Sequence, residues 1–165
     1  MALVKQTLQA ELTAIYEKGP TGNPDGLQVG IDTAKAYLNY CSAAQNQAGM
    51  TMVAMPGSAT LGTELGGIYM KTSLSGTLTA TKIANAFDLC LMTFLSTFQT
   101  SIVTGPFKGL LKTYLDIYLN KPAITAAAFA KNFAMALHLA TTAPAIQCSG
   151  VVPGPAPYVF SGPIV

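Results

Sequence analysis

The chain repeats one apolar pattern three times, and this repetition limits its fold more than any other feature of the sequence. The pattern spaces large apolar residues for one face of a helix and ends in an Ile-Tyr pair. It reads Leu8-x3-Leu12-x2-Ile15-Tyr16, then Leu61-x3-Leu65-x2-Ile68-Tyr69, then Leu110-x3-Tyr114-x2-Ile117-Tyr118. Such a repeat indicates one supersecondary unit copied three times, each too small to bury its apolar face alone.

A second pattern follows each copy at a spacing of 50 residues. It opens with a residue type that caps helix N-termini and continues with small residues that allow helices to approach closely. The capping positions are Asp25, Ser75 and Thr125, and the central small residues are Ala34, Ala84 and Ala134. We therefore expect a second helix in each unit, with its alanine face packed against the Ile-Tyr end of the first helix.

The apolar periodicity and the Gly/Pro breaks predict six helices. Their expected ranges are 3–18, 25–48, 59–72, 77–103, 106–121 and 125–142. Short loops between neighbours predict antiparallel αα-hairpins, so the predicted fold class is all-α, with six helices arranged as three hairpins of period about 50 residues. We interpret Tyr16, Tyr69 and Tyr118 as packing residues of this repeat, with hydroxyls that reach water.

The composition changes near residue 145, which predicts a helical domain over 1–145 and an extended arm over 146–165. Residues 151–165 hold four prolines and two glycines, which exclude a helix, together with large apolar side chains. Those side chains also argue against a solvated tail and predict a docked segment. The candidate interface residues are Tyr158, Val159, Phe160, Ile164 and Val165. The arm can dock on its own subunit or on the next one.

The charge content indicates a covered surface. Charged residues make up 10% of the chain, against about 25% in an ordinary soluble domain. We expect neighbouring subunits or lipid to cover part of the surface, because few charges leave apolar patches unshielded. All nine basic residues are lysines, scattered without a cluster, so nucleic-acid recognition is not expected.

The sequence offers no recognisable set of catalytic, cofactor-binding or metal-binding residues, and we predict a protein that is not an enzyme. Cys41, Cys90 and Cys148 have no metal-ligand spacing, and the single histidine, His138, is typical of a packed or interface residue. The seven acids form no pair at a fixed spacing, and Asp88 and Asp116 are expected to be solvated. No phosphate-binding loop or nucleophile elbow occurs. The first residues lack the apolar run of a signal peptide.

Several stretches are similar to small Ala/Thr-rich helical structural proteins of tailed bacteriophage particles. They are the pattern from Leu8 to Tyr16, the Ala34-x-Ala36-Tyr37 step, the stretch from Ala134 through His138 to Thr141, and the Pro/Gly-rich ending. The resemblance implies a non-enzymatic subunit of the neck, tail, baseplate or head, made in the host cytoplasm and located in the virion. The partners it implies are copies of the chain itself and other subunits of the particle. The lack of tryptophan and the Met-rich segment from Met50 to Met55 depart from the resemblance.

Two alternatives stay open. A membrane-associated helical protein would also explain residues 89–107 and 132–165, which lack Asp, Glu, Lys and Arg. The many Thr and Ser residues of the first stretch and the prolines of the second argue against a membrane span. The other alternative is a helical module that encloses an apolar ligand between its hairpins.

Overall fold

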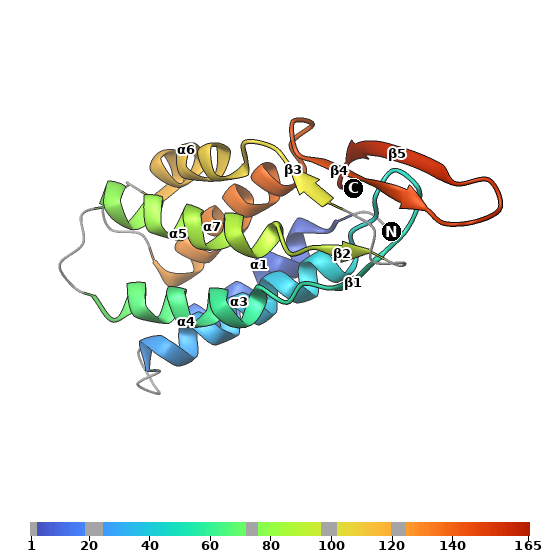
Figure 1. The fold of residues 1–165 in the computed structure, drawn as a ribbon. Coiled ribbons are helices and arrows are strands. Elements are labelled where there is room, and N and C mark those ends of the chain that lie inside the picture. The colour runs from blue at the N-terminus through green and yellow to red at the C-terminus, as the bar shows by residue number, and fades with distance from the viewer. Residues whose placement is uncertain (1–2, 19–24, 72–75, 97–101, 120–124) are drawn as a thin grey trace.

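The computed structural model of the chain describes residues 3–18, 25–71, 76–96, 102–119 and 125–165. Within these ranges the chain is mostly helical, as the periodicity predicts (Figure 1). The helices are α1 (Lys5–Glu17), α3 (Gly26–Ser42), α4 (Ser58–Tyr69), α5 (Gly76–Leu91), α6 (Phe107–Leu119) and α7 (Ala126–Thr141).

The prediction of a purely α-helical fold is wrong, because the described part of the chain also forms five short strands. The strands are β1 (Met52–Ala54), β2 (Leu95–Ser96), β3 (Ile102–Thr104), β4 (Gln147–Val152) and β5 (Tyr158–Pro163). β1 and β2 form an antiparallel pair, and β3, β4 and β5 form an antiparallel sheet in that order. The strands gather at one end of the helices, which we call the strand end and which lies at the right in Figure 1.

The helices pack in a closed cycle. Each helix contacts the next one along the chain, from α1 through α3, α4, α5 and α6 to α7, and α7 packs back against α1. The second-helix alanines Ala34, Ala84 and Ala134 are buried in this bundle. Aromatic rings fill its interior, where Tyr37 and Phe87 meet edge to face with centroids 4.9 Å apart.

One helix pair approaches unusually closely. Gly30 of α3 faces Gly62 and Gly66 of α4, and a Cβ added at Gly30 would lie 2.2 Å from the backbone nitrogen of Gly66. Glycines inside a helix lower its intrinsic stability, so by sequence alone Gly62 and Gly66 weaken α4. Here they allow the two backbones to come into direct contact.

Two predicted helices end earlier than their apolar periodicity indicates, because side chains offer the backbone other partners. The second helix ends at Ser42 instead of residue 48, and the Asn46 carboxamide oxygen accepts from the backbone nitrogens of Ala48 and Met50 at 3.0 Å each. The fourth ends at Leu91 instead of residue 103. There the Thr93 hydroxyl donates to the Cys90 carbonyl at 2.7 Å, which competes with helix continuation.

The predicted caps are confirmed at two of their three positions. The Asp25 carboxylate accepts from the Leu27 backbone nitrogen at 3.1 Å, and the Thr125 hydroxyl accepts from that of Ala128 at 3.2 Å. Ser75 lies outside the described residues.

The predicted arm is non-helical and returns to its own subunit as the β4–β5 hairpin. Phe160 and Ile164 are buried in the helical core, and Val165 exchanges two backbone hydrogen bonds with Gln45, at 2.7 and 3.0 Å. The division of the chain at residue 145 stays a prediction, with both parts contributing to one core.

Candidate functional site

The five candidate interface residues of the arm separate into two groups. Phe160 and Ile164 are 2% and 1% exposed, so they are not available to a partner in this structure. Tyr158, Val159 and Val165 are 55%, 72% and 50% exposed. Along β5 side chains alternate between the two faces of the sheet, which carries Phe160 into the core and Val159 away from it.

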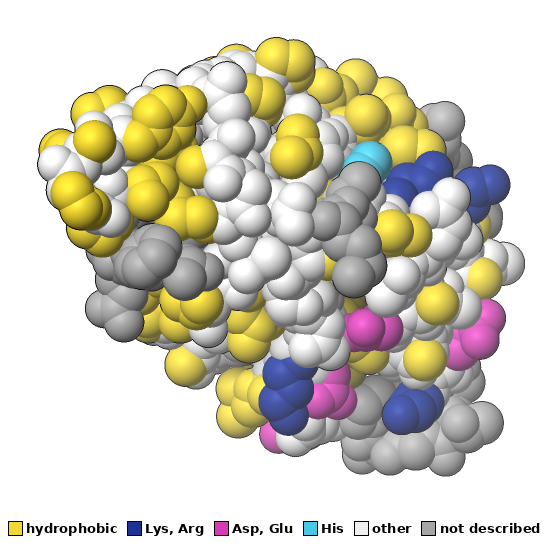
Figure 2. Space-filling view, turned by 90° about the vertical axis from the view of Figure 1, so that its right-hand side faces the viewer, with side chains coloured by type: hydrophobic (Ala, Val, Ile, Leu, Met, Phe, Trp, Pro, Cys, Tyr) yellow, Lys and Arg dark blue, Asp and Glu magenta, His cyan; other side chains and the backbone are white. Residues whose placement is uncertain are grey.

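The strand end is uncharged over long stretches of sequence. Three segments, 36–63, 89–107 and 132–165, contain no Asp, Glu, Lys or Arg, and all five strands belong to them. Figure 2 looks at this end of the molecule, and the charged side chains visible there lie in its lower part and at its right, with hydrophobic side chains at the upper left. Large exposed apolar residues on the strands include Val53, Ile102 and Val151. The strands are therefore free of charged residues and expose apolar side chains to solvent.

The repeat tyrosines have different environments. The Tyr16 and Tyr69 hydroxyls hydrogen-bond each other at 2.8 Å, and Tyr16 also bonds the Thr33 hydroxyl at 3.2 Å. Burial raises the pKa of Tyr16 to about 12 and that of Tyr69 well above its usual value. Both residues are partly buried, and that their hydroxyls also reach water stays a prediction. Tyr118 is half-buried, and its backbone carbonyl accepts from the Asn132 side chain at 3.1 Å.

The third copy of the first-helix pattern, which the sequence analysis starts at Leu110, lies one residue before the positions that the helix buries. In α6 the fully buried leucines are Leu111 and Leu115, whereas Leu110 and Tyr114 are only partly buried and Ile117 is 53% exposed. The residues 61 and 65 of α4 precede 111 and 115 by 50 positions, the same spacing as the second-helix pattern.

His138 packs against another helix. Its Nδ1 atom lies 2.7 Å from the Tyr40 hydroxyl, and the two rings meet edge to face. Partial burial and the nearby Lys5 ammonium lower the pKa of His138, which favours the neutral ring. This environment is that of a packed residue, as the sequence indicates.

The two acids singled out by sequence also have partners. Asp88 accepts from the Lys108 backbone nitrogen at 3.2 Å, close to the start of α6. Partial burial raises the pKa of this carboxyl group. Asp116 forms an ion pair with Lys112 one turn away on α6. Both acids have evident structural partners.

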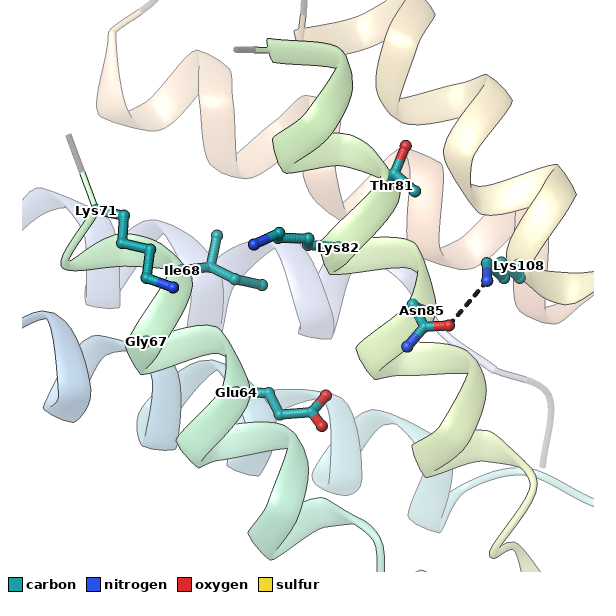
Figure 3. Close-up of a pocket in the computed structure, with 8 residues that line it drawn as sticks. All are labelled: Glu64, Gly67, Ile68, Lys71, Thr81, Lys82, Asn85 and Lys108. Carbon is teal, nitrogen blue, oxygen red and sulfur yellow. Dashed lines mark hydrogen bonds between the residues drawn. The ribbon is translucent and has the colours of Figure 1, made fainter. Parts of the chain in front are cut away.

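A groove of about 390 Å³ between α4 and α5 is a second candidate site, and the sequence gives no sign of it. Its lining combines three lysines, one acid, two uncharged polar residues and an apolar floor (Figure 3): Lys71, Lys82, Lys108, Glu64, Thr81, Asn85, Gly67 and Ile68. The lysines come from three different parts of the chain, so only the fold brings them together.

Metal and membrane sites were expected to be absent. Among the described residues, no three His, Cys, Asp or Glu side chains cluster so as to hold a metal ion. In the same part of the chain, no helix combines the length and apolar character needed to cross a bilayer. The absence of a cofactor or metal stays a prediction.

Comparison with known proteins gives no relative. No family model, no curated protein and no solved structure matches the chain.

Proposed function

We propose that the chain is a non-enzymatic structural subunit that assembles with copies of itself through the strand end. The observation that carries this proposal is the combination of strands without charged residues and exposed Tyr158 and Val159 on an edge strand. Exposed apolar patches of this kind mark interaction surfaces, and an edge strand offers unpaired backbone groups to another chain. Copies of one chain favour symmetric contacts, because the same surface is present on both partners.

We further propose that the architecture is a three-fold internal repeat. Its support is the burial of equivalent positions: α3, α5 and α7 each bury seven residues at the same spacing of 50, and the first of them are Gly30, Ala80 and Ala130. The other six are 33, 34, 36, 37, 40 and 41, then 83, 84, 86, 87, 90 and 91, then 133, 134, 136, 137, 140 and 141. The strands follow the same spacing, since β1 at 52–54 corresponds to β3 at 102–104.

The setting that we propose is a tailed bacteriophage particle, on the strength of the sequence resemblance. The low charge content and the strands without charged residues are in keeping with a subunit whose surface is largely covered in a particle. Its partners would then be further copies of the chain and other structural subunits, and its location the virion.

The test compares the association of the wild-type protein with that of a charged variant. Tyr158→Lys/Val159→Lys places two lysines on the edge strand, where charge opposes strand pairing. The matched control is Ile117→Lys, at an apolar residue of similar exposure on α6. Size-exclusion chromatography with light scattering measures the mass of each over a range of concentrations.

We expect the wild type and Ile117→Lys to form a defined assembly, and the double variant to elute at the subunit mass of 17.1 kDa. Negative-stain images of the assembly then give its symmetry. A wild-type protein that stays at the subunit mass at every concentration contradicts the proposal, as does a double variant that assembles normally.

A further inference from the structure

The α4–α5 groove holds the formal excess charge of the whole chain. Three of its lining residues are lysines and one is Glu64, which leaves two positive charges, and the chain as a whole has a formal net charge of +2. The remaining lysines and acids of the sequence therefore balance each other. The groove lining itself therefore carries two formal positive charges.

Two of the three groove lysines are directed toward its apolar floor (Figure 3). Figure 3 shows Lys71 of the segment after α4 and Lys82 of α5 with their side chains directed toward the space beside Ile68. The ion pairs among the described residues, Lys35–Asp32 and Lys112–Asp116, include no lysine of the groove. Like charges that converge without a bound carboxylate repel each other, and an anion between them removes that repulsion.

Asn85 fixes the third lysine at the far side of the groove. The Lys108 ammonium donates to the Asn85 side-chain oxygen at 2.9 Å (Figure 3). That bond occupies the amide oxygen and leaves the amide NH2 of Asn85 as a donor at the groove wall. The groove therefore presents donors of two kinds, ammonium and amide, above an apolar residue.

We propose that this groove binds a small phosphate monoester, with the phosphate between Lys71 and Lys82 and the organic group over Ile68. A phosphate monoester carries close to two negative charges at neutral pH and three acceptor oxygens, which matches the charge and the donors of the groove. Lysine binds phosphate as a compact point charge, without the planar geometry that arginine provides. The volume of about 390 Å³ leaves room for a small organic group beside the phosphate. This proposal does not depend on assembly through the strand end.

The test is isothermal titration calorimetry of the full chain with phenyl phosphate at low ionic strength, with inorganic phosphate and benzyl alcohol as comparison ligands. We expect saturable binding of phenyl phosphate at one site per chain, weaker binding of inorganic phosphate and none of benzyl alcohol. Binding should strengthen as the pH rises through about 6, where the monoester loses its second proton.

Three variants locate the site. Lys71→Met and Lys82→Met should each weaken binding about tenfold, the loss of one charge-assisted hydrogen bond. Lys131→Met removes an exposed lysine of α7 outside the groove and should leave affinity unchanged. Circular dichroism checks that each variant is folded. Absence of saturable binding, or equal weakening by all three substitutions, overturns the proposal, since both outcomes indicate only general attraction of anions to lysines.

Discussion

At the scale of single residues, glycine determines how closely α3 and α4 pack. A Cβ added at Gly66 would lie 2.7 Å from the Cα atom of Leu27, so α3 would have to move away. Gly67 is the next residue of the same helix, and a Cβ there would meet nothing within 4 Å. The two neighbours therefore have the same intrinsic helix propensity, but only Gly66 is in close contact with another helix.

Alanine substitutions at these neighbours should change stability in opposite directions. We expect Gly66→Ala to lower the free energy of unfolding by about 1–3 kcal/mol, because the backbones must separate. Gly67→Ala should raise it by about 0.5–1 kcal/mol, because alanine restricts the unfolded chain without a clash. Urea unfolding followed by circular dichroism measures both. A stabilising Gly66→Ala would mean that α3 and α4 do not make this contact.

At the scale of elements, the sequence predicts where helices start better than where they end. Asp25 and Thr125 identify helix starts because a cap bonds a backbone nitrogen two or three residues away. Helix ends at Ser42 and Leu91 depend on local competition that apolar periodicity does not contain. The strands could not be predicted from the sequence, because they are short and pair with strands that are distant along the chain, as Met52 does with Ser96.

The alanine positions of the second helices give the prediction at this scale. Ala84 and Ala134 are fully buried, so Ala84→Leu and Ala134→Leu should each cost about 1–3 kcal/mol through overpacking. Asp32→Leu is the control, because Asp32 is partly exposed and its ion pair with Lys35 lies near the surface. Its effect should be about 0.5 kcal/mol or less. Equal urea midpoints for the three variants would contradict the helix register.

At the scale of the whole molecule, the β4–β5 hairpin contributes to folding as well as presenting an exposed surface. Sequence alone identifies its apolar residues as a docked arm but cannot show that Phe160 and Ile164 face inward while Val159 faces outward. The lysine groove could not be predicted from the sequence for a similar reason. Lys71, Lys82 and Lys108 line one groove only after α4, α5 and α6 have packed together.

Two substitutions within this segment should separate folding from association. Ile164→Ser should lower the free energy of unfolding by about 2–5 kcal/mol, because it empties a buried position and brings a hydroxyl into the core. Val159→Ser should change it by less than about 0.5 kcal/mol while weakening association. Thermal unfolding and light scattering on the same samples measure the two effects. An Ile164→Ser protein as stable as the wild type would show that the segment is not part of the core.

The packing of α7 against α1 also affects how the chain reaches its native state. Bonds between the first and last thirds of the chain, such as Tyr37 to Thr141 across 104 residues, form only when distant segments meet. An open array of hairpins can fold one unit at a time from either end, whereas a closed cycle has a high contact order and a larger loop-closure entropy. During synthesis α1 therefore has no α7 to pack against until α7 has itself left the ribosome. We therefore expect closure of the cycle to come late in folding.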